Sequence, residues 1–268
     1  MRIDIDQVLR QRLPAKHRYI PRWAVRWLER YVCQDRLNHI LAAMGSSKGV
    51  EAAAIALREL DISVTAIGLD ALPTSGRYLF ASNHPLGGLD GLALIKVVGE
   101  KYGGAVRFLV NDLLMAVKPL DNVFMPINKY GRQSREAAAL IEEEFAGPKQ
   151  MLTFPAGLCS RRMDDGTIAD LPWHKAVVAM AVRNCRDVVP VFFEAQNSAA
   201  FYRNARLRER LGIKFNVEMV MLPREMVKQQ GGHFNVYFGA PVSWQSLNAR
   251  DAKAEAARLR QLVYTLKH

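Results

Sequence analysis

Short apolar runs alternate with longer amphipathic stretches from about residue 60 to the end of the chain. The apolar runs, rich in β-branched and aromatic residues, predict strands, and the stretches between them predict helices. This alternation indicates an α/β fold, with a mixed, largely parallel sheet covered by helices. The predicted strands are 62–68, 77–82, 106–111, 122–127, 150–155, 187–193 and 233–239, and the predicted helices are 88–103, 134–147, 172–185, 200–212 and 245–267.

Residues 1–60 form a different pattern, predicted to be an N-terminal helical segment before a domain of residues 61–268. Within it, two stripes recur every four residues, aromatic Trp23, Trp27 and Tyr31 beside basic Arg22, Arg26 and Arg30. Amphipathic aromatics beside arginines suit a helix that lies in a membrane interface. The same stripes also fit an ordinary helix that packs its aromatics on the domain. The sequence leaves both interpretations open.

Charge narrows the choice of partner. The formal net charge of +11 over 268 residues favours an acidic partner, such as an anionic membrane surface, a phosphorylated small molecule or nucleic acid. The chain carries no nucleic-acid-binding motif, so no specific nucleic-acid partner is expected. The basic stretch at 201–214, on a predicted helix, fits lipid headgroups, an acidic carrier protein or a solvated face equally well.

Cysteine usage and hydropathy bear on location. The three cysteines form no CxxC pair, which argues against a disulfide framework or a zinc site and favours a reducing compartment. The N-terminus lacks an apolar signal-peptide core. No apolar run approaches the roughly 20 residues that a membrane-spanning helix needs. We therefore expect a peripheral protein on the cytoplasmic face of the inner membrane.

Candidate chemistry lies in SNHPLGGLDG, residues 82–91. His84 follows a predicted buried strand and precedes a predicted helix, where the sites of α/β sheets usually form. Asp90 is near enough to accept a hydrogen bond from one imidazole nitrogen, which leaves the other to act as a base. Without a neighbouring serine or cysteine nucleophile, this pair predicts direct deprotonation of a substrate hydroxyl or amine. In the alternative interpretation, Asp90 caps the helix and His84 is a satisfied turn residue.

Further stretches follow in a recognisable order: VFMPINK (123–129), FPAGLCS (154–160), DLPWHKAVVAMA (170–181) and VVPVFF (188–193). With NHPLGGLDG, they resemble the blocks of the glycerolipid acyltransferase superfamily of lysophosphatidic acid type. Five residues separate His84 from Asp90 where four are usual. Ala156 replaces the usual Glu, and Cys159 replaces the usual Arg. These departures resemble a divergent bacterial hemolysin-like branch that includes ornithine and glycine lipid O-acyltransferases.

The resemblance implies an enzyme, a membrane-surface lipid O-acyltransferase. It would move a fatty acyl group from acyl carrier protein or coenzyme A to the hydroxyl of a lysolipid, either a lyso-amino-acid lipid such as lyso-ornithine or lyso-glycine lipid, or lysophosphatidic acid. His84 would be the general base and Asp90 its orienting partner. No metal or resident cofactor is expected, since the thioester is a co-substrate. Backbone N–H groups near Gly157 or Gly87 would stabilise the oxyanion.

An acidic headgroup also needs cations to bind it. In the family an arginine takes this role, but Cys159 stands at its position here, so other basic residues would have to replace it. The predicted substrate-binding residues are Asn83, Lys129, Gly157, Ser160, Arg161, Arg162 and Lys175, with Arg132 as a further candidate cation.

Two other functions remain open. One is a membrane-binding protein of hemolysin-like type without catalysis, and the other is hydrolysis of acyl thioesters with water as the acceptor.

Overall fold

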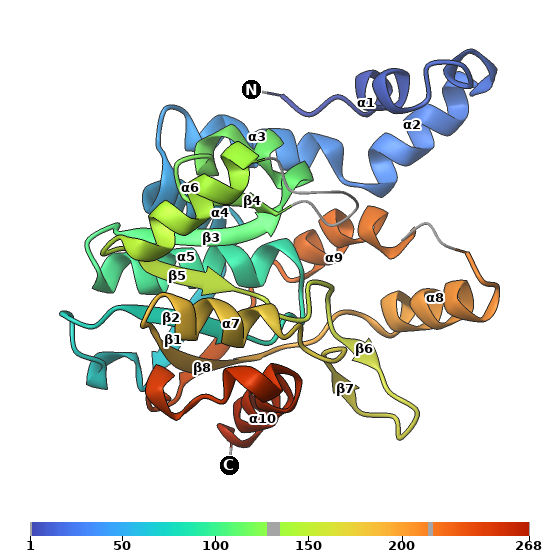
Figure 1. The fold of residues 1–268 in the computed structure, drawn as a ribbon. Helices are drawn as coiled ribbons and strands as arrows, with labels where there is room; N and C mark the ends of the chain where they lie inside the picture. Colours follow the sequence, from blue (N-terminus) through green and yellow to red (C-terminus); the bar gives the residue numbers. More distant parts are fainter. Residues whose placement is uncertain (1, 128–134, 214–216, 268) are drawn as a thin grey trace.

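The computed structural model describes residues 2–127, 135–213 and 217–267. A seven-stranded sheet in the order β1-β9-β8-β2-β5-β3-β4 forms the centre of this part of the chain (Figure 1). From β8 to β4 the strands run parallel, whereas β9 pairs antiparallel with β8 and parallel with β1. The strands are β1 Ser63–Ile67, β2 Tyr78–Ser82, β3 Val106–Asn111, β4 Phe124–Ile127, β5 Gln150–Thr153, β8 Asp187–Glu194 and β9 His233–Phe238, and the short hairpin is β6 Arg161–Arg162 with β7 Ile168–Ala169.

Helices cover both faces of the sheet. The helices are α1 Ile5–Arg12, α2 Arg22–Tyr31, α3 Gln34–Met44, α4 Gly49–Glu59, α5 Gly88–Lys101, α6 Arg135–Ala146, α7 Ala176–Arg183, α8 Ala199–Arg210, α9 Leu222–Lys228 and α10 Ala252–Thr265. Strand β2 shows how the faces divide, since successive side chains point to opposite sides. Phe80 packs with α3, α4 and α5, while Leu79 and Ala81 pack with α6, α7 and α10.

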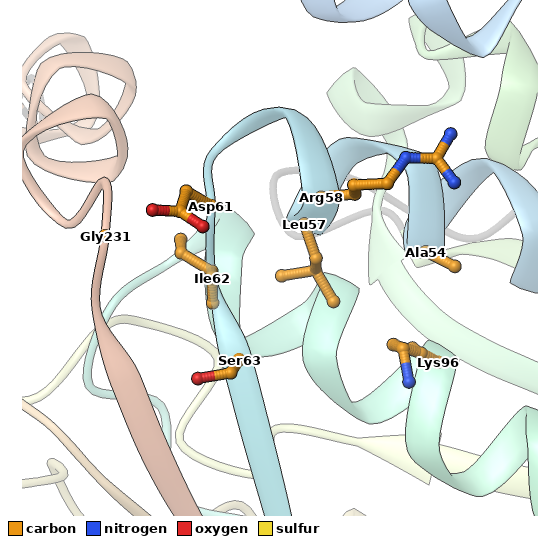
Figure 2. A pocket seen from close by; sticks show the side chains of 8 residues that line it. All are labelled: Ala54, Leu57, Arg58, Asp61, Ile62, Ser63, Lys96 and Gly231. Carbon is orange, nitrogen blue, oxygen red and sulfur yellow. The ribbon is translucent and has the colours of Figure 1, made fainter.

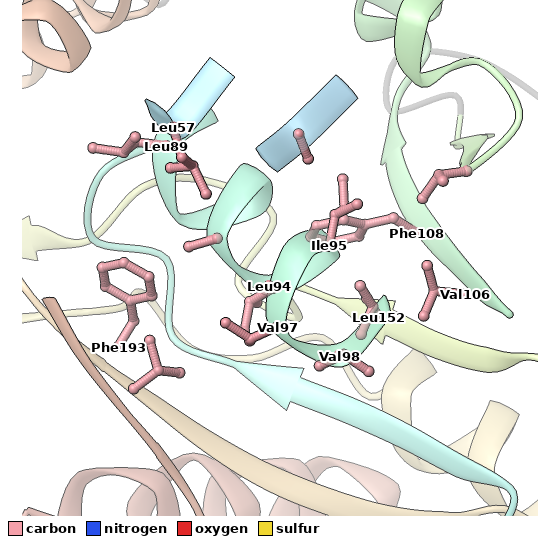
Figure 3. Close-up of a cluster of buried hydrophobic side chains, with 14 of the residues drawn as sticks. Leu57, Leu89, Leu94, Ile95, Val97, Val98, Val106, Phe108, Leu152 and Phe193 are labelled. Carbon is pink, nitrogen blue, oxygen red and sulfur yellow. The ribbon is translucent and has the colours of Figure 1, made fainter. Parts of the chain in front are cut away.

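Helix α5 packs against the sheet and contributes many of the buried side chains of the main core. Figure 3 shows Leu94, Ile95 and Val98 of α5 among side chains from β3 and β5, and all three are fully buried. Burying a large aliphatic side chain contributes about 1.5–3 kcal/mol. This packing fixes the start of α5 relative to the end of β2, and therefore the loop that carries His84.

The predicted α/β class, with its mixed, largely parallel sheet, is confirmed, and each predicted strand is present within a few residues. The last helix is shorter than predicted. It begins at Ala252, where the Asp251 side chain accepts a hydrogen bond from the Ala254 N–H, and 3-10 turns at Trp244–Ser246 and Ala249–Asp251 precede it. The hairpin of β6 and β7 and helix α9 were not predicted, because both are too short for a periodic pattern.

The N-terminal helices differ in how they pack. Ile40 and Met44 of α3 and most of α4 belong to the main core, whereas α1 has no buried residue and α2 buries Val25. Helices α1 and α2 project from the body in Figure 1. The division of the chain at residue 60 stays a prediction. In the part of the chain that the structure describes, no helix combines the length and the hydropathy required to cross a bilayer.

Candidate active site

The loop between β2 and α5 is held by Asn83. Its Nδ2 donates to the Phe193 carbonyl at 3.0 Å, and its Oδ1 accepts from the Phe193 N–H at 2.6 Å. Both ends of the amide are thus paired with the backbone of β8, and the side chain is 3% exposed. Asn83 was predicted to bind substrate, but in the structure its side chain links the loop to β8 and so fixes the position of His84 at the end of β2.

His84 and Asp90 form the predicted pair. His84 Nδ1 lies 3.0 Å from Asp90 Oδ2, and Asp90 is fully buried. The same oxygen accepts from the Leu86 N–H at 2.9 Å and the Gly87 N–H at 3.3 Å, so the carboxylate also caps α5. Gly87 has a φ of 89°, a conformation that L side chains rarely adopt. The two interpretations of Asp90 are therefore compatible, because one carboxylate orients the imidazole and caps the helix.

The surroundings of His84 favour its cationic form. Burial disfavours the cation, but the charges of Asp90 and Cys159 and hydrogen bonds with both side chains outweigh it, so the pKa of His84 lies well above its ordinary value. A carboxylate that stabilises the imidazolium strengthens the ring as a proton acceptor. The imidazole also stacks on Phe154, with ring centroids 3.9 Å apart. The ring is thus held in one orientation, with Nδ1 on Asp90.

A second carboxylate, Asp170, links the stretch at 154–160 to this loop. Its Oδ1 accepts from the His84 N–H at 3.1 Å and the Ser160 hydroxyl at 2.7 Å, and its Oδ2 accepts from Trp173 Nε1 at 2.9 Å. Burial raises the pKa of the Asp170 carboxyl despite these hydrogen bonds. The Ser160 N–H in turn donates to the His84 carbonyl at 2.7 Å. Sequence reasoning did not single out Asp170 as a site residue, because its contact with His84 spans 86 residues.

The predicted cations occupy different environments. Arg161 is buried, donating to Glu218 at 3.0 Å and to the Cys159 carbonyl at 2.7 Å, whereas Arg162 is exposed on β6. Lys175 is exposed at the start of α7, in the turn where the His174 N–H donates to the Pro155 carbonyl. Lys129 and Arg132 lie outside the described residues. Arg161 therefore carries a buried ion pair, and Arg162 and Lys175 face solvent.

The predicted oxyanion donors are already engaged. The Gly157 N–H donates to the Phe154 carbonyl at 2.9 Å in a turn where Gly157 has a φ of 66°, and the Gly87 N–H donates to Asp90. Ser160 is likewise committed to Asp170. In this arrangement these groups shape the loops around His84, and the donors for an oxyanion stay a prediction.

Comparisons with known proteins decide the family. The family model described as acyltransferase matches residues 7–268. Two proteins named lyso-glycine lipid O-acyltransferase, from Bacteroides thetaiotaomicron and Phocaeicola vulgatus, are each 42% identical over 265 residues, which is 98% of this chain and 97% and 95% of theirs. The chain belongs to the acyltransferase family. The family membership predicted from the ordered blocks is confirmed. The prediction that the chain is an acyltransferase related to the glycine lipid branch is confirmed as well.

A solved structure is also similar to this acyltransferase. The crystal structure of the 1-acyl-sn-glycerophosphate acyltransferase PlsC from Thermotoga maritima has a TM-score of 0.47 and 14% sequence identity, and the match covers 81% of this chain and 82% of that chain.

Two of the surface hollows in the described part of the acyltransferase are of similar size. One, of about 360 Å³, is lined by residues of α4, α5, the start of β1 and the turn before β9, including Asp61, Lys96 and Gly231 (Figure 2). It shares no residue with the His84 loop or with the stretch at 154–160. The other, of about 330 Å³, is lined by Arg162, Gly166, Ile168, Gln196, Asn197, Ala199 and Tyr202. Asn197 Nδ2 donates to the Pro85 carbonyl at 2.9 Å, so this second hollow adjoins the loop that carries His84.

The bracing role of Asp170 gives a first prediction. Asp170→Asn keeps an oxygen toward His84 and Ser160 but turns its amide nitrogen toward Trp173 Nε1, which is also a donor. Leaving that pair unsatisfied should lower the free energy of unfolding by about 1–3 kcal/mol in urea titrations. Trp173→Phe in the same chain removes the facing donor, so the double variant should lose less than the two single variants combined. Strict additivity would contradict the bracing role.

Proposed function

We propose that this acyltransferase transfers a fatty acyl group from a thioester to the hydroxyl of a lysolipid with a small acidic headgroup, of the lyso-glycine lipid type. The observation that carries the proposal is the 42% identity, over nearly the whole of both chains, to two proteins named lyso-glycine lipid O-acyltransferase. The His84–Asp90 pair supports it, since an oriented, partly exposed imidazole is suited to take a proton from a hydroxyl. Acyl carrier protein and coenzyme A thioesters are the proposed donors.

The chemistry requires no group beyond the chain and the two substrates. His84 Nε2 accepts the hydroxyl proton while that oxygen attacks the thioester carbonyl. Asp90 holds the opposite nitrogen and stabilises the imidazolium that forms. The tetrahedral intermediate then expels the thiolate, which takes the proton back from His84. An ester and a free thiol leave, and the imidazole returns to its neutral form.

A covalent route through Cys159 is the alternative to direct attack. Cys159 is buried and its side chain hydrogen-bonds with His84. In that route the thiol would be acylated first, and the acceptor hydroxyl would attack the acyl-cysteine. We propose direct attack, because the thiol lies among Phe201, Tyr202 and Met221 in an apolar cluster.

Direct attack makes a prediction for Cys159→Ala. The variant should retain most of the transfer rate, and intact-mass measurements on wild type given donor without acceptor should show no acylated protein. Cys159→Ser serves as the matched control for loss of sulfur alone. A stoichiometric acyl adduct on wild type, absent from Cys159→Ala together with transfer, would establish the covalent route instead.

We also propose that the acyltransferase works on an anionic membrane surface. Trp23 and Trp27 of α2 are 72% and 56% exposed, and Arg22, Arg26 and Arg30 beside them are exposed too. Helix α8 adds exposed Leu207 and, after its end, Leu211. Helices α2 and α8 project on one side of the body in Figure 1, and α9 lies between them. From α9, Arg224 lies over the ring of Tyr31 in α2, and Leu222 packs beside Gly87 in the His84 loop. The proposed membrane side is therefore next to the catalytic loop.

The membrane proposal predicts a binding defect for the double variant Trp23→Ala and Trp27→Ala. Losing two rings that would enter the interface should weaken sedimentation with phosphatidylglycerol vesicles about 10-fold or more. Ile67→Ala, which removes an exposed apolar side chain from edge strand β1, should bind as wild type does. Equal binding by both variants would remove α2 from the membrane contact. Location on the cytoplasmic face of the inner membrane stays a prediction.

The function is tested by acyl transfer in vesicles. Labelled acyl carrier protein and coenzyme A thioesters are offered with lyso-glycine lipid, lyso-ornithine lipid and lysophosphatidic acid. The proposal expects transfer to lyso-glycine lipid above the other acceptors. Vesicle binding without transfer to any lysolipid would favour the non-catalytic alternative.

A further inference from the structure

The ring of Phe154 covers one face of the His84 imidazole. The two ring centroids are 3.9 Å apart and the ring planes are inclined by 17°, so the rings are stacked. The hydrogen bond that Nδ1 makes with Asp90 fixes one edge of the imidazole. A single hydrogen bond tolerates some tilt of the ring, because its preferred geometry is broad. The stacked ring limits that tilt, since the imidazole would collide with the phenyl face.

Phe154 is itself held at its backbone and at its ring. It directly follows β5, and its carbonyl accepts from the Gly157 N–H at 2.9 Å. Its ring packs against Phe108 of β3, with centroids 5.1 Å apart and planes at 56°. Gly91 of α5 lies on the same two rings, since a Cβ placed there would be 3.4 Å from Phe108 and 3.8 Å from Phe154. The phenyl ring therefore has little room to move away from the imidazole.

The stacking also affects the charge of the imidazole, which becomes a cation when it accepts the hydroxyl proton. The face of an aromatic ring attracts a cation that lies within about 6 Å of its centroid. The His84 side chain is 15% exposed, so water screens this attraction little. In the described part of the chain, Asp90 of α5, Cys159 and Asp170 are titratable groups that act on His84. The phenyl ring stabilises the same cation without carrying a charge.

We propose that Phe154 is a positioning residue for acyl transfer, whose ring holds the plane of the His84 imidazole and stabilises the imidazolium formed as the acceptor hydroxyl loses its proton. The inference rests on the proposed function and extends its account of the base. Asp90 acts on the edge of the imidazole at Nδ1, and Phe154 acts on its face. Nε2 is left to receive the proton in a fixed direction.

The first measurement is the pKa of His84, which does not depend on acyl transfer. It is read from an NMR titration of histidine-labelled protein, with the His84 signals assigned by their absence from His84→Ala. Phe154→Leu keeps an apolar contact but has no aromatic face, and Phe154→Tyr keeps the face. Phe234→Leu is the matched control, because Phe234 is a buried phenylalanine of the same core on β9, two strands from β2.

Phe154→Leu should lower the pKa of His84 by about 0.4 to 1.5, because the cation loses the aromatic face. On the alkaline plateau, where His84 is neutral, kcat for transfer should fall about 3- to 30-fold, while KM for the lysolipid stays unchanged. The acid limb of kcat/KM should move to lower pH with the pKa of His84. Phe154→Tyr should restore both the pKa and kcat, and Phe234→Leu should match wild type in both.

Three results would overturn the inference. The pKa of His84 could be the same in Phe154→Leu as in wild type. Phe154→Tyr could lose as much rate as Phe154→Leu, as expected of a residue that only fills space. The pKa could fall in Phe154→Leu while kcat on the plateau stays at the wild-type value. The predicted fall of the pKa in a protein that transfers no acyl group would instead overturn the proposed function and keep the stabilisation of the cation.

Discussion

His84→Ala should lower kcat for acyl transfer by about 10²–10⁴-fold, the range for loss of a positioned general base. The imidazole is held by Asp90 and stacked on Phe154, so its removal takes away the oriented proton acceptor. The backbone bonds of residue 84, from its N–H to Asp170 and from Ser160 to its carbonyl, do not depend on the side chain. The variant should therefore fold, bind vesicles and bind lysolipid as wild type does.

The measurement is single-turnover transfer in vesicles, with circular dichroism as the check on folding. His39→Ala is the matched control, because His39 is a surface histidine that pairs with Glu59 at 3.1 Å. It should transfer at the wild-type rate. A folded His84→Ala variant with kcat near that of wild type would remove the base from the mechanism.

Asp90→Asn should lower kcat/KM by about 10–10²-fold while keeping the fold. The oxygen of the asparagine is expected at the place of Oδ2, where it still accepts from Leu86, Gly87 and His84 Nδ1. The contacts of Oδ2 and the tautomer of the ring are thus preserved, whereas the negative charge is lost together with the acceptor for the Gly91 N–H, which donates to Oδ1 at 2.9 Å. Asp90→Ala removes the cap as well, so it should also lower the free energy of unfolding by about 1 kcal/mol or more.

The pH dependence separates charge from geometry. Transfer needs neutral His84, so the rate rises with pH as the imidazolium loses its proton. Because Asp90 and Cys159 raise the pKa of His84, the acid limb of kcat/KM in wild type should lie above the ordinary value of about 6.5. Without the charge of Asp90, the limb should move to lower pH. An acid limb that does not move in Asp90→Asn would show that another group controls it.

The local part of the site could be predicted from sequence, because its partners are close in the chain. His84 and Asp90 lie within one strand–loop–helix unit, and the turn-forming glycines between them fix the approach of the two side chains. The strands and the sheet class also follow from the short apolar runs that alternate with longer amphipathic stretches.

The long-range contacts could not be predicted. Arg161 and Arg162 are neighbours of the same type, yet one is buried against Glu218, 57 residues away, and the other lines the hollow beside the site. Asp170 braces His84 from a separation of 86 residues. Asn197 reaches the Pro85 carbonyl across 112 residues. In each case the sheet topology brings the partners together, and no local pattern records that.

The most direct test of the account is the stoichiometry between donor cleavage and lipid formation. Thiol released from acyl carrier protein or coenzyme A thioester and acylated lipid formed are measured together, with and without lyso-glycine lipid in the vesicles. The account predicts one thiol for each acylated lipid, and no release above background when the acceptor is omitted. Rapid thiol release without an acceptor, with little acylated lipid when it is present, would contradict acyl transfer and establish a thioester hydrolase.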